Sequence, residues 1–204
     1  VWAEALDNGD PEKAVPFRDK LMSLAAPFQA PPREIARTKQ RFEMITWLGT
    51  RGFALVTESE WKKSWRTTSL LDADRPAQPL KVVFDLNSQD RYKDPGRPVM
   101  TETLSGQETA LLEGDWIYLA GEGASPQGSR PFLDRFNVRS LEKRRIFQSA
   151  AGRYESFVAF QGDSRRLLLI SSESPSDPPN IARLDLKTGQ RWKLTDYRDP
   201  APQL

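Results

Sequence analysis

Residues 53–87, FALVTESEWKKSWRTTSLLDADRPAQPLKVVFDLN, contain three short apolar runs separated by polar and proline-bearing segments. The runs are FALVTES from Phe53, RTTSLLD from Arg66 and KVVFDLN from Lys81. Apolar and β-branched runs of this length between turn residues are typical of strands, and none of them keeps the 3.6-residue period of a helix. This stretch therefore predicts consecutive antiparallel strands.

The same three types of run recur along the chain. They begin at Val1, Phe53, Trp116 and Leu167 for the first type, at Arg18, Arg66, Phe132 and Asn180 for the second, and at Arg33, Lys81, Lys143 and Arg191 for the third. Successive starts are 48, 66 and 48 residues apart in the second type and 48, 62 and 48 in the third. Two strand types thus share nearly one period, and four-stranded repeats of roughly 40 to 50 residues are typical of β-propeller blades.

A preceding run completes each repeat. It is FEMITWL from Phe42 in one repeat and SFVAFQG from Ser156 in another, while either PVMTETL from Pro98 or ETALLEG from Glu108 fits the repeat between them. An antiparallel sandwich also has short strands and frequent turns, but it has no reason to repeat at a fixed period.

We therefore expect an all-β fold of four-stranded antiparallel β-propeller blades, about three blades plus most of a fourth. The chain would begin inside the second strand of one blade and form a single incomplete propeller segment over residues 1–204. The expected blades are 1–41 (partial), 42–97, 98–153 and 154–204.

Blade topology sorts the loops into two sets. Connections from the second to the third strand, and from one blade to the next, lie on one face of a propeller, and the other hairpins lie on the opposite face. The first set contains the long, polar, proline-rich segments ESEWKKSW, EGASPQGSRP, ESPSDPPN and SQDRYKDPGRP. We expect all the elaborated loops on one face, where loops on a rigid scaffold commonly bind ligands. Alternatively, proline and glycine merely stiffen these connections.

Composition excludes several classes of function. The chain has 204 residues, 38% of them hydrophobic, so it can bury a sizeable core. Its net charge is +2 and its Lys and Arg are scattered, which argues against nucleic acid as a partner. No apolar run approaches the roughly 20 residues that span a bilayer, so no membrane partner is expected.

The chain contains no His and no Cys. A Ser-His-Asp or Cys-His nucleophile, a His-ligated zinc site and a disulfide are therefore impossible within it. The segment GASPQG, residues 123–128, has one residue too many for a G-x-S-x-G nucleophile elbow and lies between two strands, so Ser125 is not expected to be a nucleophile. We expect no catalytic residue, no metal and no cofactor in this chain.

Three longer segments resemble a known family. They are QDRYKDPGRPVM (residues 89–100), GEGASPQGSRPFLDRF (121–136) and SESPSDPPN (172–180), and the likeness extends over nearly the whole chain. These segments resemble the propeller domain of the prolyl oligopeptidase family of serine peptidases, most closely its glutamyl endopeptidase-like branch. The resemblance implies a seven-bladed propeller that precedes a C-terminal α/β-hydrolase domain carrying a Ser-Asp-His triad, and that restricts entry of large substrates.

On this resemblance, the chain is a catalytically silent propeller segment of a serine peptidase. It would gate and position peptide substrates, with the peptide and the C-terminal α/β-hydrolase domain of the parent chain as its partners. The resemblance also favours the bacterial periplasm. The competing class is a non-enzymatic propeller that serves as a platform for protein interactions. In either case, unpaired blade edges would allow self-association.

A peptidase of glutamyl preference must neutralise a substrate carboxylate. Arginine suits this role because its guanidinium is permanently charged and donates two parallel hydrogen bonds. The candidates for substrate binding on the elaborated face are Arg91, Arg130 and Arg135. Alternatively, Arg130 and Arg135 pair with Asp134 or with backbone carbonyls and merely hold the loop.

Overall fold

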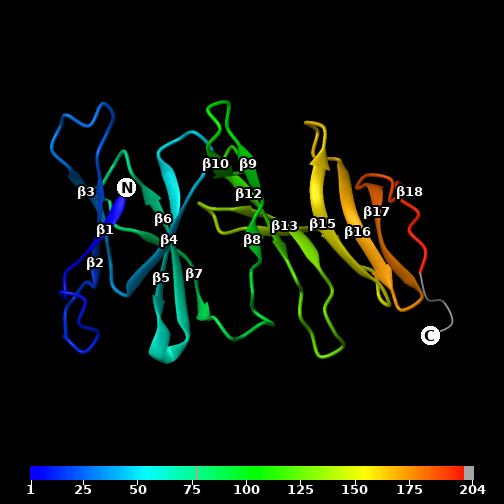
Figure 1. The fold of residues 1–204 in the computed structure, drawn as a ribbon, viewed down its shortest axis with the longest axis horizontal. Coiled ribbons are helices and arrows are strands. Elements are labelled where there is room, and N and C mark those ends of the chain that lie inside the picture. The colour runs from blue at the N-terminus through cyan, green and yellow to red at the C-terminus, as the bar shows by residue number, and fades with distance from the viewer. Residues whose placement is uncertain (77, 200–204) are drawn as a thin grey trace. The chain divides into compact units, whose positions relative to one another are not determined.

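The computed structural model describes residues 1–76 and 78–199 and is shown as a ribbon in Figure 1. Residue 77 and the last five residues of the expected fourth blade, 200–204, lie outside the described residues. The described chain contains strands and one 3-10 turn but no α-helix, and no helix there is long and apolar enough to cross a membrane.

Two compact units make up the chain. The first consists of Val1–Asp90 with Met100–Ile117, and the second consists of Arg91–Val99 together with the residues from Tyr118 onward. Neighbouring strands pair in antiparallel fashion in the sheets of both units.

The first unit holds two sheets whose strand order follows the chain. One sheet contains β1 (Trp2–Ala5), β2 (Asp19–Ser23) and β3 (Arg33–Thr38). The other contains β4 (Arg41–Trp47), β5 (Phe53–Glu60), β6 (Trp65–Asp72) and β7 (Lys81–Asn87), with the 3-10 turn η1 (Trp61–Lys63) between β5 and β6. A two-stranded hairpin of β9 (Met100–Glu102) and β10 (Glu108–Ala110) also belongs to this unit.

Two further sheets follow along the chain. One has the order β11 (Leu112–Glu113), β12 (Trp116–Gly121), β13 (Phe132–Asn137) and β14 (Lys143–Gln148), and β8 (Arg97–Pro98) also pairs with β12. The other has the order β15 (Tyr154–Gln161), β16 (Leu167–Ser174), β17 (Asp177–Asp185) and β18 (Arg191–Lys193).

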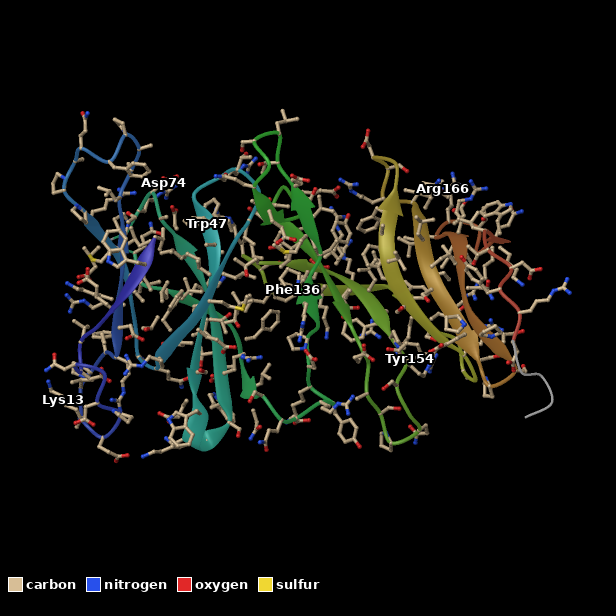
Figure 2. The ribbon with its side chains drawn as sticks, in the orientation of Figure 1. Lys13, Trp47, Asp74, Phe136, Tyr154 and Arg166 are labelled. Carbon is tan, nitrogen blue, oxygen red and sulfur yellow. The ribbon has the colours of Figure 1, made fainter. Side chains whose placement is uncertain are left out.

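The apolar runs of the sequence form strands whose aliphatic side chains are buried. In the first unit, Leu21 of β2, Ile35 of β3 and Val56 of β5 are each at most 1% exposed and belong to one cluster, against which Trp47 of β4 packs (Figure 2). Each such aliphatic side chain contributes about 1.5 to 3 kcal/mol when fully buried. The faces of the first two sheets are therefore held together by one apolar core.

Buried carboxylates add a polar component to this packing. Asp7, on the β1–β2 connection, is fully buried and accepts hydrogen bonds from Arg18 at 2.9 Å and Arg41 at 2.6 Å. Arg41 also binds Asp19 of β2, so that one guanidinium of β4 joins two carboxylates of the preceding sheet. A buried carboxylate is tolerated because it is paired and hydrogen-bonded in this way.

Successive antiparallel sheets, two of them four-stranded with their strands in chain order, are typical of β-propeller blades, so the expected all-β fold class is confirmed. We propose that the blades correspond to β1–β3, β4–β7, β8 with β11–β14, and β15–β18.

The third blade departs from the expectation that a single run supplies its first strand. Both candidate runs contribute, because β8 pairs with Leu119 and Ala120 of β12 while β11 pairs with Trp116 and Ile117 of the same strand. The β9–β10 hairpin is inserted between β8 and β11. Ala110 of this hairpin bridges to Leu48, beside the β4–β5 turn, so an elaborated connection also occurs on the side expected to carry only short hairpins.

The prediction of long loops between second and third strands is also wrong in part. ESEWKKSW contributes strand residues at both ends and is closed by η1 and Ser64, and ESPSDPPN is a turn of two residues followed directly by β17. Pro178 and Pro179 are accommodated because they lie within a register shift between Ser172 and Ser174 of the β16–β17 ladder. The segments 88–96 and 122–131 are long connections, as expected.

Candidate functional site

The β12–β13 connection, residues 122–131, is an ordered ribbon. At its neck the backbone N–H of Arg130 donates to the carbonyl of Gly123 at 3.0 Å. At its tip Ser125 and Gly128 exchange two backbone hydrogen bonds of 3.0 and 3.1 Å, and the Ser125 hydroxyl donates to the Gly128 carbonyl at 2.7 Å. The serine is thus a turn residue whose hydroxyl serves the loop itself. In Figure 1 this connection extends toward the bottom of the view and the β15–β16 turn toward the top.

Glycine is required at this neck. Gly123 has φ +59°, and a Cβ atom placed there would lie 2.0 Å from the carbonyl oxygen of Arg130. The two backbones approach so closely that any side chain would separate them. The position of Arg130 therefore depends on the absence of a side chain at Gly123.

Arg130 is held by its side chain as well as by its backbone. Its Nε and Nη2 atoms both donate to the carbonyl oxygen of Ser149, at 3.1 and 2.9 Å. Ser149 is fully buried; its N–H donates to Pro131 at 2.8 Å and its hydroxyl donates to the carbonyl of Arg153 at 2.7 Å. The guanidinium is therefore anchored to the β14–β15 connection, with Nη1 outside these bonds.

A cavity of about 1210 Å³ lies beside Arg130, within the second unit. Four connections, together with residues of β13, β14, β15 and β16, line it. Its lining includes Lys93 and Asp94 before β8, residues 123–130 in part, Lys143 and Arg145 of β14, residues 151–154, and residues 173–175. Tyr154 marks its position in Figure 2.

The charged groups of this cavity are mostly cationic. Its lining carries two carboxylates, Asp94 and Glu173, and five cations, namely Lys93, Arg130, Lys143, Arg145 and Arg153. The arginines differ in their partners, because Arg145 binds the buried carboxylate of Asp134 and Arg153 reaches Asp177 at 3.3 Å. Within the described residues, Arg130 binds only a neutral carbonyl. Its charge is therefore available to an anionic ligand.

Tyr154 of β15, which lines the cavity, is hydrogen-bonded to the start of the β12–β13 connection. Its hydroxyl donates to the Glu122 carboxylate at 2.6 Å. This bond to a carboxylate, together with burial, raises the pKa of Tyr154 to about 12. The contact joins the start of the β12–β13 connection to β15, so it restrains the ribbon that carries Arg130.

Only one of the three predicted site residues lines the cavity in the structure. Arg130 lines the cavity, whereas Arg91 and Arg135 are not among its lining residues; Arg91 is exposed and Arg135 lies on β13. Asp134, considered as a partner for Arg130 or Arg135, binds Arg145 of β14. The alternative of a backbone carbonyl partner agrees with the bond from Arg130 to Ser149.

Sequence reasoning missed the other cations of the cavity. Lys143 and Arg145 lie two residues apart on β14, and alternate residues of a strand point to the same face. The run KRRIF therefore contained a signal for a basic strand face, although it was interpreted only as a strand.

No family model matches the chain. Two curated relatives do: a probable chloroplastic glutamyl endopeptidase of Oryza sativa subsp. japonica is 31% identical over 219 residues, and its counterpart in Arabidopsis thaliana is 31% identical over 222 residues. Each alignment covers 100% of this chain and 23% of the relative. Among solved structures, an oligogalacturonate lyase in complex with manganese aligns with a TM-score of 0.52 and 13% identity, over 86% of this chain and 47% of the other, which is a likeness of fold alone.

The fold defines the class of protein, which is a segment of β-propeller blades. The chain is similar to part of two probable glutamyl endopeptidases, and it spans less than a quarter of the length of these relatives. The resemblance to the glutamyl endopeptidase-like branch is thereby confirmed.

Proposed function

We propose that this chain is the part of a peptidase propeller that positions peptide substrates for a separate α/β-hydrolase domain of the parent chain. The similarity to two curated relatives supports this proposal, because both are named as probable glutamyl endopeptidases. The chain itself would be catalytically silent, since it contains no His to serve as a general base and its Ser125 hydroxyl is engaged within its own turn.

The observation that carries the proposal is the environment of Arg130. Its guanidinium is oriented by two hydrogen bonds to one carbonyl, it lines a large cavity, and it has no carboxylate partner among the described residues. A charged donor held in a fixed orientation binds a carboxylate with little further loss of conformational freedom. We therefore assign to Arg130 the recognition of an acidic side chain of the peptide.

Gating would follow from the same arrangement. The cavity is lined in part by connections that leave the ends of the strands, and Arg130 belongs to one of them. We propose that these connections face the hydrolase domain, so that a folded protein is excluded while an extended peptide is admitted.

Replacement of Arg130 by Ala in the full-length parent enzyme tests this function. We expect kcat/KM for a chromogenic peptide with Glu at the cleavage site to fall roughly 10-fold or more relative to the same peptide with Gln, because a charge-assisted hydrogen bond is lost. Arg91→Ala and Arg135→Ala serve as controls, since neither side chain lines the cavity. An equal loss for both peptides would assign Arg130 to loop support, and no loss would remove it from the site.

A further inference from the structure

Arg145 is a second guanidinium of the cavity that is fixed in orientation. Its Nε and Nη2 atoms bind the carboxylate of Asp134, which is fully buried. Its guanidinium carbon lies 4.1 Å from the centroid of the Phe132 ring, so one face of the group stacks on an aromatic side chain. The Arg145 side chain nevertheless keeps 39% of its surface exposed.

The local charge around Asp134 is positive despite its carboxylate. Lys143 lies 3.8 Å from the same carboxylate, so two cations share one buried anion. One positive charge thus remains on the cavity side of β14. Arg153, by contrast, is engaged by Asp177 and by the hydroxyl of Ser172 at 3.0 Å.

Arg130 and Arg145 are held in the same manner and line the same cavity. Each uses Nε and Nη2 for its fixed partner, which leaves Nη1 outside those bonds. The fixed partner of Arg130 is Ser149, whose N–H binds Pro131, and the ring under Arg145 is Phe132, which is paired with Gln148. The Pro131–Ser149 hydrogen bond lies just outside the β13–β14 ladder, next to its terminal pair Phe132 and Gln148, and both guanidinium groups line one cavity.

We propose that the cavity recognises a peptide with two carboxylates, one bound by Arg130 and the other by Arg145. This inference rests on the proposed function and specifies its substrate class. In an extended peptide, side chains two residues apart point to the same side and lie about 7 Å apart along the chain. Acidic residues with one residue between them thus offer two carboxylates on one side of the peptide to the two arginines of this cavity.

Binding of short capped peptides to the 204-residue chain tests the proposal by calorimetry. The probes are Ac-Ala-Glu-Ala-Glu-Ala-amide, the two peptides in which one Glu is replaced by Gln, and the peptide with Gln at both positions. The capped termini leave the glutamates as the only charges. We expect the diacidic peptide to bind about tenfold more tightly than either monoacidic peptide, and to keep this preference at 150 mM salt, which screens non-specific attraction.

Variants then locate the two contacts. The double variant D134N/R145Q removes the second guanidinium without leaving a buried carboxylate beside the vacated position, and it should reduce diacid affinity to the monoacid level while monoacid binding is retained. Arg130→Gln should weaken the binding of both the diacidic and the monoacidic peptides. Lys187→Gln, which removes one charge outside the cavity, is the matched control and should change neither. Circular dichroism and thermal melting verify that each variant is folded.

The outcomes separate this inference from the proposed function. If the diacidic peptide binds no more tightly than the monoacidic ones to the unmodified chain, the second contact is wrong while the contact through Arg130 stands. If the diacidic and the monoacidic peptides all bind no more tightly than the neutral peptide, the carboxylate contact of the proposed function fails as well. If D134N/R145Q is unfolded, the comparison of peptides on the unmodified chain still decides the matter, and Arg145→Lys tests the requirement for the guanidinium.

Discussion

Replacement of Gly123 by Ala should destabilise the chain by about 1 kcal/mol more than a glycine substitution in an open turn. A non-glycine residue in the left-handed conformation of Gly123 costs roughly 1 to 2 kcal/mol. The added Cβ would also lie 2.0 Å from the Arg130 carbonyl oxygen, so the neck of the ribbon must open and lose the hydrogen bond from Arg130 to Gly123, worth about 1 kcal/mol. We expect the free energy of unfolding to fall by about 2 to 3 kcal/mol.

Gly162→Ala is the matched control. Gly162 has φ +75°, but a Cβ atom there would meet no atom within 4 Å, so only the conformational cost of about 1 to 2 kcal/mol applies. Urea unfolding followed by tryptophan fluorescence measures both variants against the unmodified chain. In addition, Gly123→Ala should weaken binding of acidic peptides, because Arg130 moves with the neck. Equal destabilisation by the two substitutions, with peptide binding unchanged, would refute the claim that the closed neck positions Arg130.

Three further predictions concern titration and activity. The Arg18 hydrogen bond holds the pKa of Asp7 at about 2, below its ordinary 3.8, so this carboxylate contributes stability above about pH 4 that is lost as the pH falls toward 2. Asp7→Asn should therefore flatten the pH dependence of the unfolding free energy in that window, and an unchanged slope would contradict the assignment. The bond to Glu122 raises the pKa of Tyr154 to about 12, so its contribution to stability is complete below pH 10 and is lost as the pH rises toward 12. Glu122→Gln should move the Tyr154 pKa toward 10 in an NMR titration of labelled tyrosine, and a pKa that stays near 12 would show another cause. The purified chain should cleave no glutamyl or prolyl chromogenic peptide, a result that activity surviving repurification would overturn.

The repeat of strand types made the blades predictable from the sequence. The runs from Phe53, Arg66 and Lys81 correspond to β5, β6 and β7, because a strand needs only a short apolar run and a turn at each end. The broken first strand of the third blade was not predictable in the same way. Both β8 and β11 are only two residues long, and their places were decided by pairing with β12 rather than by their own pattern.

The candidate site was predictable only in part. Arg130 could be named because it lies in a long connection between strands. The role of Arg145 could not, since it depends on the buried Asp134 and the ring of Phe132 on the neighbouring strand, and such cross-strand contacts follow from register. The bond from Arg130 to Ser149 likewise joins the two connections that flank the β13–β14 hairpin, and it depends on the register of that hairpin.

A crystal structure of the full-length parent enzyme with a bound glutamyl peptide tests the central claim most directly. The measured quantity is the distance from the peptide carboxylate to Nη1 of Arg130. We predict a hydrogen bond of about 3 Å, with Arg130 still bound to the Ser149 carbonyl and the cavity open toward a hydrolase domain. A carboxylate bound elsewhere, with Arg130 contacting only Ser149, would contradict the assignment of this propeller cavity to substrate recognition.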